Sequence, residues 1–144
     1  MHVIASVQQG WSWTGLRPIE VVDDNAFGNL IIRDDAGRFW RVCPEELSCS
    51  VVANSAAEYQ GLTSTEDFRE DWSMVNIVNA ARAKCGPLGP GMKYCLKIPA
   101  TLGGKYETEN FATITLGELI RASGDIAQQI QNVPDGQAVR LVAK

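Results

Sequence analysis

Short strand-forming runs separated by turn residues are the feature that most constrains the fold of this 144-residue chain. β-Branched and aromatic residues dominate residues 19–22, 30–32 and 38–43. Asp34-Asp35-Ala36-Gly37 lies between the last two runs and ends in glycine, as a hairpin loop does. Pro44 ends the third run, because proline cannot donate to a strand ladder. The sequence therefore predicts that this part of the chain is β-structure containing a hairpin.

The middle of the chain, residues 55–84, has the pattern of helices. A short helical piece is predicted at residues 56–59, followed by a longer helix that Ser64 or Thr65 caps. Apolar residues that recur at helical spacing form the predicted buried stripe of this helix: Phe68, Trp72, Val75 and Val78. Gly86-Pro87 is predicted to end it.

A further helix is predicted to begin at a capping box. Thr115-Leu116-Gly117-Glu118 places a threonine at the cap and a glutamate three residues later. Apolar residues then continue at helical spacing as far as Ile130. Ser123-Gly124 interrupts this pattern, which predicts a kink or two short helices, with Asp125 capping the second.

The order of the predicted elements favours an α+β fold. Further strands are predicted at three places: residues 92–98, 111–114 and 138–142. The resulting order of β-rich region, helix, β, helix, β favours a single domain over residues 1–144, with helices packed on one face of a mostly antiparallel sheet. In this interpretation residues 1–15 are an N-terminal arm or short helix, and residues 16–144 form the core.

Charge and hydropathy narrow the classes of partner. The net charge is −4 and the isoelectric point is about 5.0, so direct binding of nucleic acid is disfavoured and a basic protein partner is favoured. No segment approaches the roughly 20 apolar residues of a membrane span. The first seven residues lack the basic and apolar regions of a secretory signal, so we expect a cytoplasmic protein whose four cysteines are reduced.

No motif in the sequence predicts catalysis, a metal site or a cofactor. The single histidine, His2, is near the N-terminus, so a Ser–His or Cys–His pair is not expected. The cysteine spacings do not match a zinc site, and neither glycine-rich segment matches a phosphate-binding loop. The acidic clusters are expected to be solvated faces or a partner-binding surface.

Five segments together are informative about the family of this chain. They are Phe27-Gly28-Asn29-Leu30, Arg38-Phe39-Trp40, Leu88-Gly89-Pro90-Gly91, Leu102-Gly103-Gly104 with Glu109-Asn110, and the predicted helix from Leu116 to Gly124. From about Phe27 to the end, the sequence resembles the C-terminal domain of type VI secretion immunity proteins. Members of this family protect bacteria from a DNase effector made by the same locus.

The resemblance implies an antitoxin that forms a one-to-one complex with a cognate effector toxin and occludes its active site. The toxin would act on nucleic acid or nucleotides, as a DNase or as a nucleotide pyrophosphokinase that depletes ATP. We expect acidic side chains on predicted loops at strand ends to reach the toxin's basic cleft: Asp34, Asp35, Glu45, Glu46, Glu107 and Glu109.

Two other functions remain open from the residues alone. The first is a small enzyme that uses carboxylate chemistry, which requires acids with perturbed pKa values in an apolar pocket. The second is a general protein-binding module outside toxin biology. The lack of a usable histidine, a metal-ligand set and a nucleotide loop weighs against the enzyme.

Overall fold

A four-stranded antiparallel sheet forms the centre of the computed structural model, which describes residues 3–133. Its strands lie in the order β1-β2-β3-β4, with bounds Pro18–Asp24, Leu30–Asp34, Phe39–Cys43 and Ser48–Ala53. A second antiparallel sheet pairs β5 with β6, with bounds Met92–Leu96 and Phe111–Thr115. The predicted α+β class and antiparallel sheet are confirmed.

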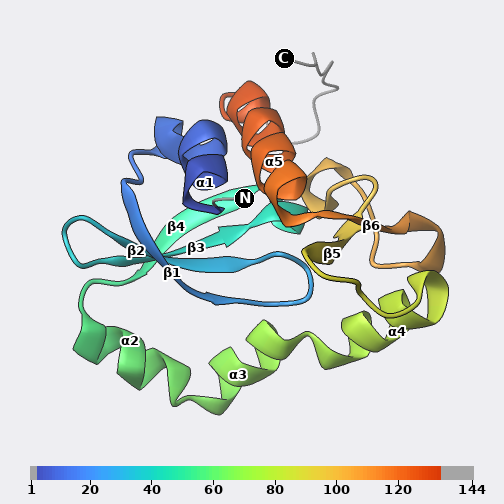
Figure 1. Ribbon diagram of the computed structural model, residues 1–144, viewed down its shortest axis with the longest axis horizontal. Coiled ribbons are helices and arrows are strands. Elements are labelled where there is room, and N and C mark those ends of the chain that lie inside the picture. Colours follow the sequence, from blue (N-terminus) through green and yellow to red (C-terminus); the bar gives the residue numbers. More distant parts are fainter. Residues whose placement is uncertain (1–2, 134–144) are drawn as a thin grey trace.

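Five α-helices surround the sheets (Figure 1): α1 (Val3–Trp11), α2 (Ala56–Thr63), α3 (Glu66–Ser73), α4 (Val75–Cys85) and α5 (Leu116–Ile130). Four short 3-10 helices lie between them: η1 (Ser12–Thr14), η2 (Pro44–Glu46), η3 (Ala100–Leu102) and η4 (Thr108–Asn110). Both counts refer to residues 3–133. The predicted strand at residues 138–142 lies outside this range.

Helices cover both faces of the four-stranded sheet, whereas the sequence predicted helices on one face (Figure 1). One face carries Leu30, Ile32 and Val42, which pack with residues of α1 and α5. The other face carries Ile31 and Phe39, which pack with partly buried residues of α2 and α3. β2 and β3 are therefore buried on both sides, as continuous apolar runs in central strands often are.

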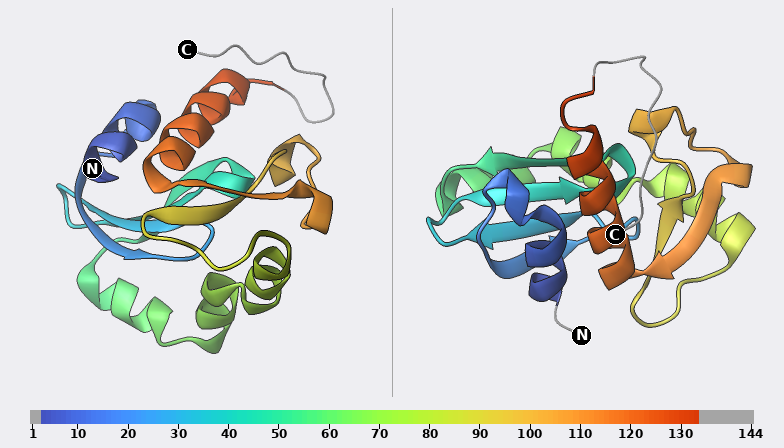
Figure 2. Two further views of the ribbon diagram at one scale, coloured as in Figure 1. Left: turned by 45° about the vertical axis from the view of Figure 1, so that its right-hand side comes forward. Right: turned by 90° about the horizontal axis from the view of Figure 1, so that it is seen from above.

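Glycine brings α1 and α5 into close contact (Figure 2). A Cβ at Gly124 would lie 2.1 Å from the carbonyl oxygen of Gly10. Trp11, only 1% exposed, donates from its indole nitrogen to the carbonyl of Ile120 at 3.1 Å. The prediction of a kink at Ser123-Gly124 is wrong, because α5 is continuous there and Gly124 serves the helix crossing.

The predicted helical region of residues 55–84 is confirmed, but it is divided into three helices. Thr65 caps α3 by accepting from the backbone of Phe68. Met74, with φ +47°, then separates α3 from α4. This break turns Val75 outward, so it is 58% exposed and does not belong to the buried stripe.

Candidate partner-binding site

The hairpin between β2 and β3 places its two predicted binding residues in opposite environments. Asp34 is 1% exposed and accepts four hydrogen bonds: from the backbone of Ala36 and Arg38, from Arg38 Nε, and from Trp40 Nε1. Asp35 is exposed at the tip of the loop. Asp34 therefore organises the hairpin, and only Asp35 presents a carboxylate to solvent.

The environment of Asp34 changes its acidity. Burial acts to raise the pKa of this carboxyl, but the hydrogen bonds from Trp40, Arg38 and Ala36 outweigh burial and hold the pKa below its ordinary value. The carboxylate is thus ionised throughout the neutral range, and the four hydrogen bonds that it accepts come from residues of the same hairpin.

Glu45 belongs to a buried polar chain that joins the sheet to α3. Glu45 is 5% exposed, and its oxygens accept from Asn29 Nδ2 at 2.7 and 3.2 Å. Arg41 donates to Asn29 Oδ1 at 3.1 and 3.0 Å and also forms an ion pair with Asp71. The guanidinium carbon of Arg41 lies 5.1 Å from the ring centroid of Trp72. Burial raises the pKa of Glu45, although its hydrogen bonds and Arg41 act in the opposite direction.

An acidic cleft of about 410 Å³ opens beside this polar chain. Its walls come from β3, η2, β4, α3, α4 and the loop before η4. Its lining residues are Arg41, Cys43, Glu45, Glu46, Ser48, Ser50, Glu70, Asp71, Met74, Ile77 and Tyr106. Glu46, Glu70 and Asp71 are exposed, and Arg41 is the one cation in this lining. The cleft is therefore a concave surface of negative charge with apolar side chains in its wall.

Tyr106 borders the cleft on a well-held loop. Asn110 donates to the carbonyls of Ile98 and Lys105, which closes the loop, and Thr101 donates to the carbonyl of Glu46. The ring of Tyr106 is 36% exposed. Partial burial, followed by the charge of Glu45 and of other acids, raises the pKa of its hydroxyl, which records the negative potential in the cleft.

The six predicted binding residues do not form one cluster. Only Glu45 and Glu46 line the cleft. Glu107 and Glu109 are exposed next to Tyr106 along the chain, and Asp35 is on the separate β2–β3 hairpin. Glu70, Asp71 and Tyr106 were not among the predicted binding residues. Glu70 and Asp71 directly precede Trp72, and Tyr106 is in the loop before Asn110. The local sequence at these places does not indicate a cleft, because the fold brings these residues to Glu46 from distant segments.

Residues 53–127 match the family described as "T6SS immunity protein Tdi1, C-terminal", where T6SS is the type VI secretion system. The chain belongs to this family. The matched residues are more than half of the chain and run from the last residue of β4 into α5. The description of the family names type VI secretion immunity proteins. The resemblance stated from the sequence is thereby confirmed.

A solved structure supports the fold. The "Crystal structure of Atu4351 from Agrobacterium tumefaciens" is similar with a TM-score of 0.56 and 14% sequence identity. The similarity covers 85% of this chain and 62% of that chain, so this chain spans less than two thirds of the length of the other. At this identity the likeness shows the fold alone. The comparison with curated proteins gives no match.

The family match covers only some of the residues that line the acidic cleft. It includes α3 and the loop before η4, and hence Glu70, Asp71 and Tyr106. It does not include the β2–β3 hairpin or η2, which carry Asp34, Asp35, Glu45 and Glu46. The two sides of the acidic cleft thus come from different parts of the sequence, one inside the match and one outside it.

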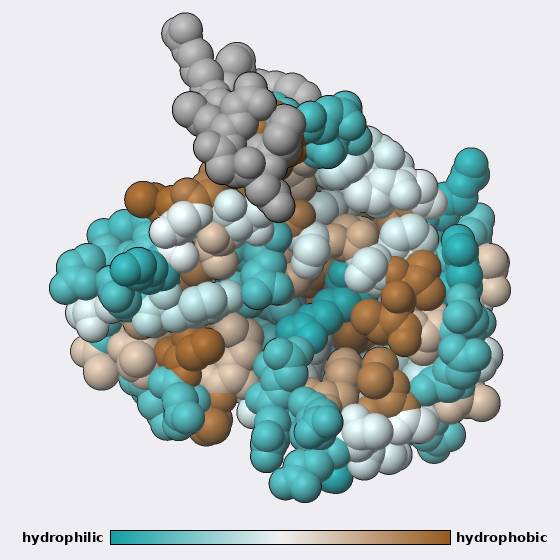
Figure 3. Space-filling view, turned by 180° about the vertical axis from the view of Figure 1, so that it is seen from behind, coloured by the Kyte–Doolittle hydropathy of each residue, from teal (hydrophilic) through white to brown (hydrophobic). Residues whose placement is uncertain are grey.

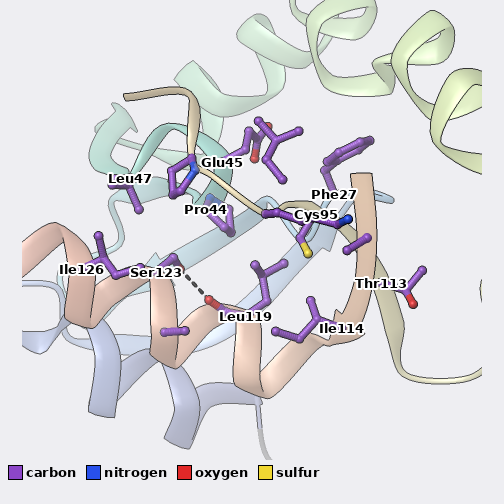
Figure 4. A pocket seen from close by; sticks show the side chains of 15 residues that line it. Phe27, Pro44, Glu45, Leu47, Cys95, Thr113, Ile114, Leu119, Ser123 and Ile126 are labelled. Carbon is purple, nitrogen blue, oxygen red and sulfur yellow. Dashed lines mark hydrogen bonds between the residues drawn. The ribbon is translucent and has the colours of Figure 1, made fainter. Parts of the chain in front are cut away.

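A second, apolar groove of about 330 Å³ lies between α5 and the β5–β6 hairpin (Figure 4). Leu47, Cys95, Ile114, Leu119 and Ile126 are among its lining residues. The hydroxyl of Ser123 points to the carbonyl of Leu119 at 2.7 Å and donates to it, so this serine is bound within its own helix. The groove therefore has the character of a packing space between elements.

Within residues 3–133, neither a metal-ligand cluster nor a membrane-spanning helix is present. No group of three or more histidine, cysteine, aspartate or glutamate residues in this range could hold a metal ion. No helix in the same range is long and apolar enough to cross a membrane. Seen from behind, the molecule has hydrophobic residues in separate small patches among hydrophilic ones (Figure 3).

Proposed function

We propose that this chain is a cytoplasmic immunity protein that binds a cognate type VI effector one-to-one and blocks its active site. The effector acts on nucleic acid or nucleotides, as a DNase or as a nucleotide pyrophosphokinase that depletes ATP. The observation that carries this proposal is the acidic cleft in a member of an immunity-protein family. Enzymes that bind phosphates present basic clefts, which an acidic protein attracts and covers.

The exposed acids of the cleft are the proposed contacts with the effector. Glu46, Glu70 and Asp71 line the same cleft as the partly exposed Tyr106, so a lysine or arginine of the effector would meet carboxylates and an aromatic ring in one cleft. Arg41 shows this arrangement inside the molecule, since it is paired with Asp71 above the ring of Trp72. The chain acts in this account by binding and not by turnover.

Of the remaining predicted acids, three are exposed and are proposed as further contacts, and two are buried and have a structural role. Glu107 and Glu109 lie near Tyr106 in sequence and would extend the acidic surface at its rim, and Asp35 offers a separate contact. Asp34 and Glu45 keep the hairpin and η2 in place through buried hydrogen bonds. Exposed charges mainly affect the rate of association, whereas buried hydrogen-bonded charge pairs mainly affect dissociation.

Charge reversal in the cleft tests these contacts. The double variant Glu46→Lys/Glu70→Lys should associate with the purified effector at least about tenfold more slowly at low salt, because attraction becomes repulsion. Surface plasmon resonance at two salt concentrations measures this rate. Glu20→Lys is the control, since Glu20 lies on β1 at the far edge of the sheet. Equal association by the double variant and the wild type would remove the cleft from the interface.

A further inference from the structure

The segment of α2 and α3, residues 56–73, is attached to the sheet by few buried contacts; we call it the strap. Neither α2 nor α3 contains a buried residue, whereas α5 contains six. The strap runs beneath the four-stranded sheet as two consecutive helices (Figure 1). Elements with little buried surface open at lower free energy than the core of the same protein.

A small set of side chains holds the strap in place. Tyr59 stacks on Phe39 with ring centroids 4.5 Å apart and an interplanar angle of 2°. Trp72 packs partly buried against the sheet, and its carbonyl accepts from Asn25 Nδ2 at 3.0 Å. The ion pair of Arg41 with Asp71 is the charged contact between sheet and strap. These contacts are spread over the strap, so separation of the strap from the sheet breaks them together.

The strap is connected to the rest of the chain by two residues at its start and by one left-handed residue at its end. At its start, Asn54 and Ser55 connect β4 to α2, and Ser55 is extended with φ −157° and ψ 165°. At its end, Met74 is a non-glycine residue in the left-handed region, with φ +47° and ψ +38°. Beyond it, α4 is anchored separately, because Ala81 is fully buried against Tyr94 and Phe111. Rotation at these two points would leave the sheet and α4 folded.

We propose that the strap opens and closes as a unit about Asn54–Ser55 and Met74, with Arg41–Asp71 as its latch. Glu70 and Asp71 of the strap form one wall of the acidic cleft, and Met74 adjoins them. Glu46 and Tyr106, on the other wall, do not belong to the strap. Opening therefore widens the cleft without unfolding its other side. This inference concerns the free protein and does not depend on the proposed function.

Hydrogen–deuterium exchange of the wild type and of Asp71→Asn tests the strap. In the wild type, amides of residues 56–73 should exchange together, well before those of β2, β3 and α5. Asp71→Asn should speed exchange in the strap by roughly two- to fivefold, the effect expected for one partly exposed ion pair, and should leave β2, β3 and α5 unchanged. Asp71 is exposed, so this variant is expected to fold.

Glu70→Gln is the matched control, because it removes the same charge from the neighbouring position of α3 while Arg41 keeps its ion pair with Asp71. It should leave strap exchange within about twofold of the wild type. Exchange of the strap only together with β2 and β3 would overturn the proposal. An equal acceleration by Glu70→Gln would overturn the assignment of Arg41–Asp71 as the latch.

Discussion

At the scale of single residues, neighbouring acids in one loop have different roles. Asp34→Asn should lower the free energy of unfolding by about 2–3 kcal/mol, because an amide cannot accept all four hydrogen bonds that the carboxylate accepts. Asp35→Asn, at an exposed position, should change it by less than about 0.5 kcal/mol. Urea denaturation at neutral pH measures both. Similar losses for the two variants would contradict the structural role of Asp34.

The lowered pKa of Asp34 also predicts a dependence on pH. Its stabilising contribution is present above the ordinary value of 3.8 and is lost as the pH falls through the folded-state pKa. The wild type should therefore lose stability on acidification more steeply than Asp34→Asn does. Denaturation curves from pH 6 to pH 2.5 give the two slopes, and parallel curves would disagree with this assignment.

Glu45 should show the opposite dependence. Burial raises the pKa of Glu45, so the folded state binds the proton of this carboxyl more tightly than the unfolded state does. The contribution of Glu45 to the free energy of unfolding therefore falls as the pH rises from 4.5 through the folded-state pKa. Glutamine at this position does not titrate. The stability of Glu45→Gln relative to the wild type should therefore increase from pH 4.5 to pH 8 in thermal denaturation. A constant difference over that range would contradict this account.

The sequence alone could identify acidic loop residues but not their burial. Asp34 and Asp35 are neighbours at the end of one apolar strand, and Glu45 and Glu46 are neighbours after the next. No local sequence pattern shows which member of each pair is buried. Their burial depends on donors that arrive from elsewhere, Trp40 for Asp34 and Asn29 for Glu45. For the same reason the sequence indicated Glu45 and Glu46 of the cleft but not Glu70 and Asp71.

At the scale of elements, two glycines in helices should respond in opposite ways to alanine. Gly124→Ala should destabilise the protein by about 2–4 kcal/mol, because the new Cβ would overlap the backbone of Gly10. Gly61→Ala, on α2 with open space around it, should stabilise by about 0.5–1 kcal/mol through helix propensity. Differential scanning calorimetry compares them. A tolerated alanine at 124 would contradict the close packing of α1 on α5.

Elements with local signals were predicted well. The cap at Thr115 and the helix after it are present, with Glu118 N donating to Thr115 Oγ1 at 3.4 Å. β4 was not predicted, because its first three residues are small and only Val51 and Val52 are β-branched; its pairing with β3 supplies the order. The break at Met74 was also missed, since a left-handed methionine leaves no pattern in the sequence.

At the scale of the whole molecule, two layers of helices enclose one sheet, and the acidic cleft lies where the strap, η2 and the loop of Tyr106 meet. The α+β class followed from the order of elements. The division of helices between two faces did not follow from that order, although the continuous apolar run at residues 30–32 is typical of a strand buried on both sides. The family resemblance supplied the function that composition alone could not indicate.

Co-expression with the protein encoded next to this chain tests the central claim most directly. The account predicts that the neighbour alone arrests growth, that co-expression restores growth, and that the two proteins purify as a one-to-one complex in which nuclease or nucleotide-pyrophosphokinase activity is inhibited. Growth arrest without rescue, in cells that contain both proteins in soluble form and no complex between them, would contradict the account.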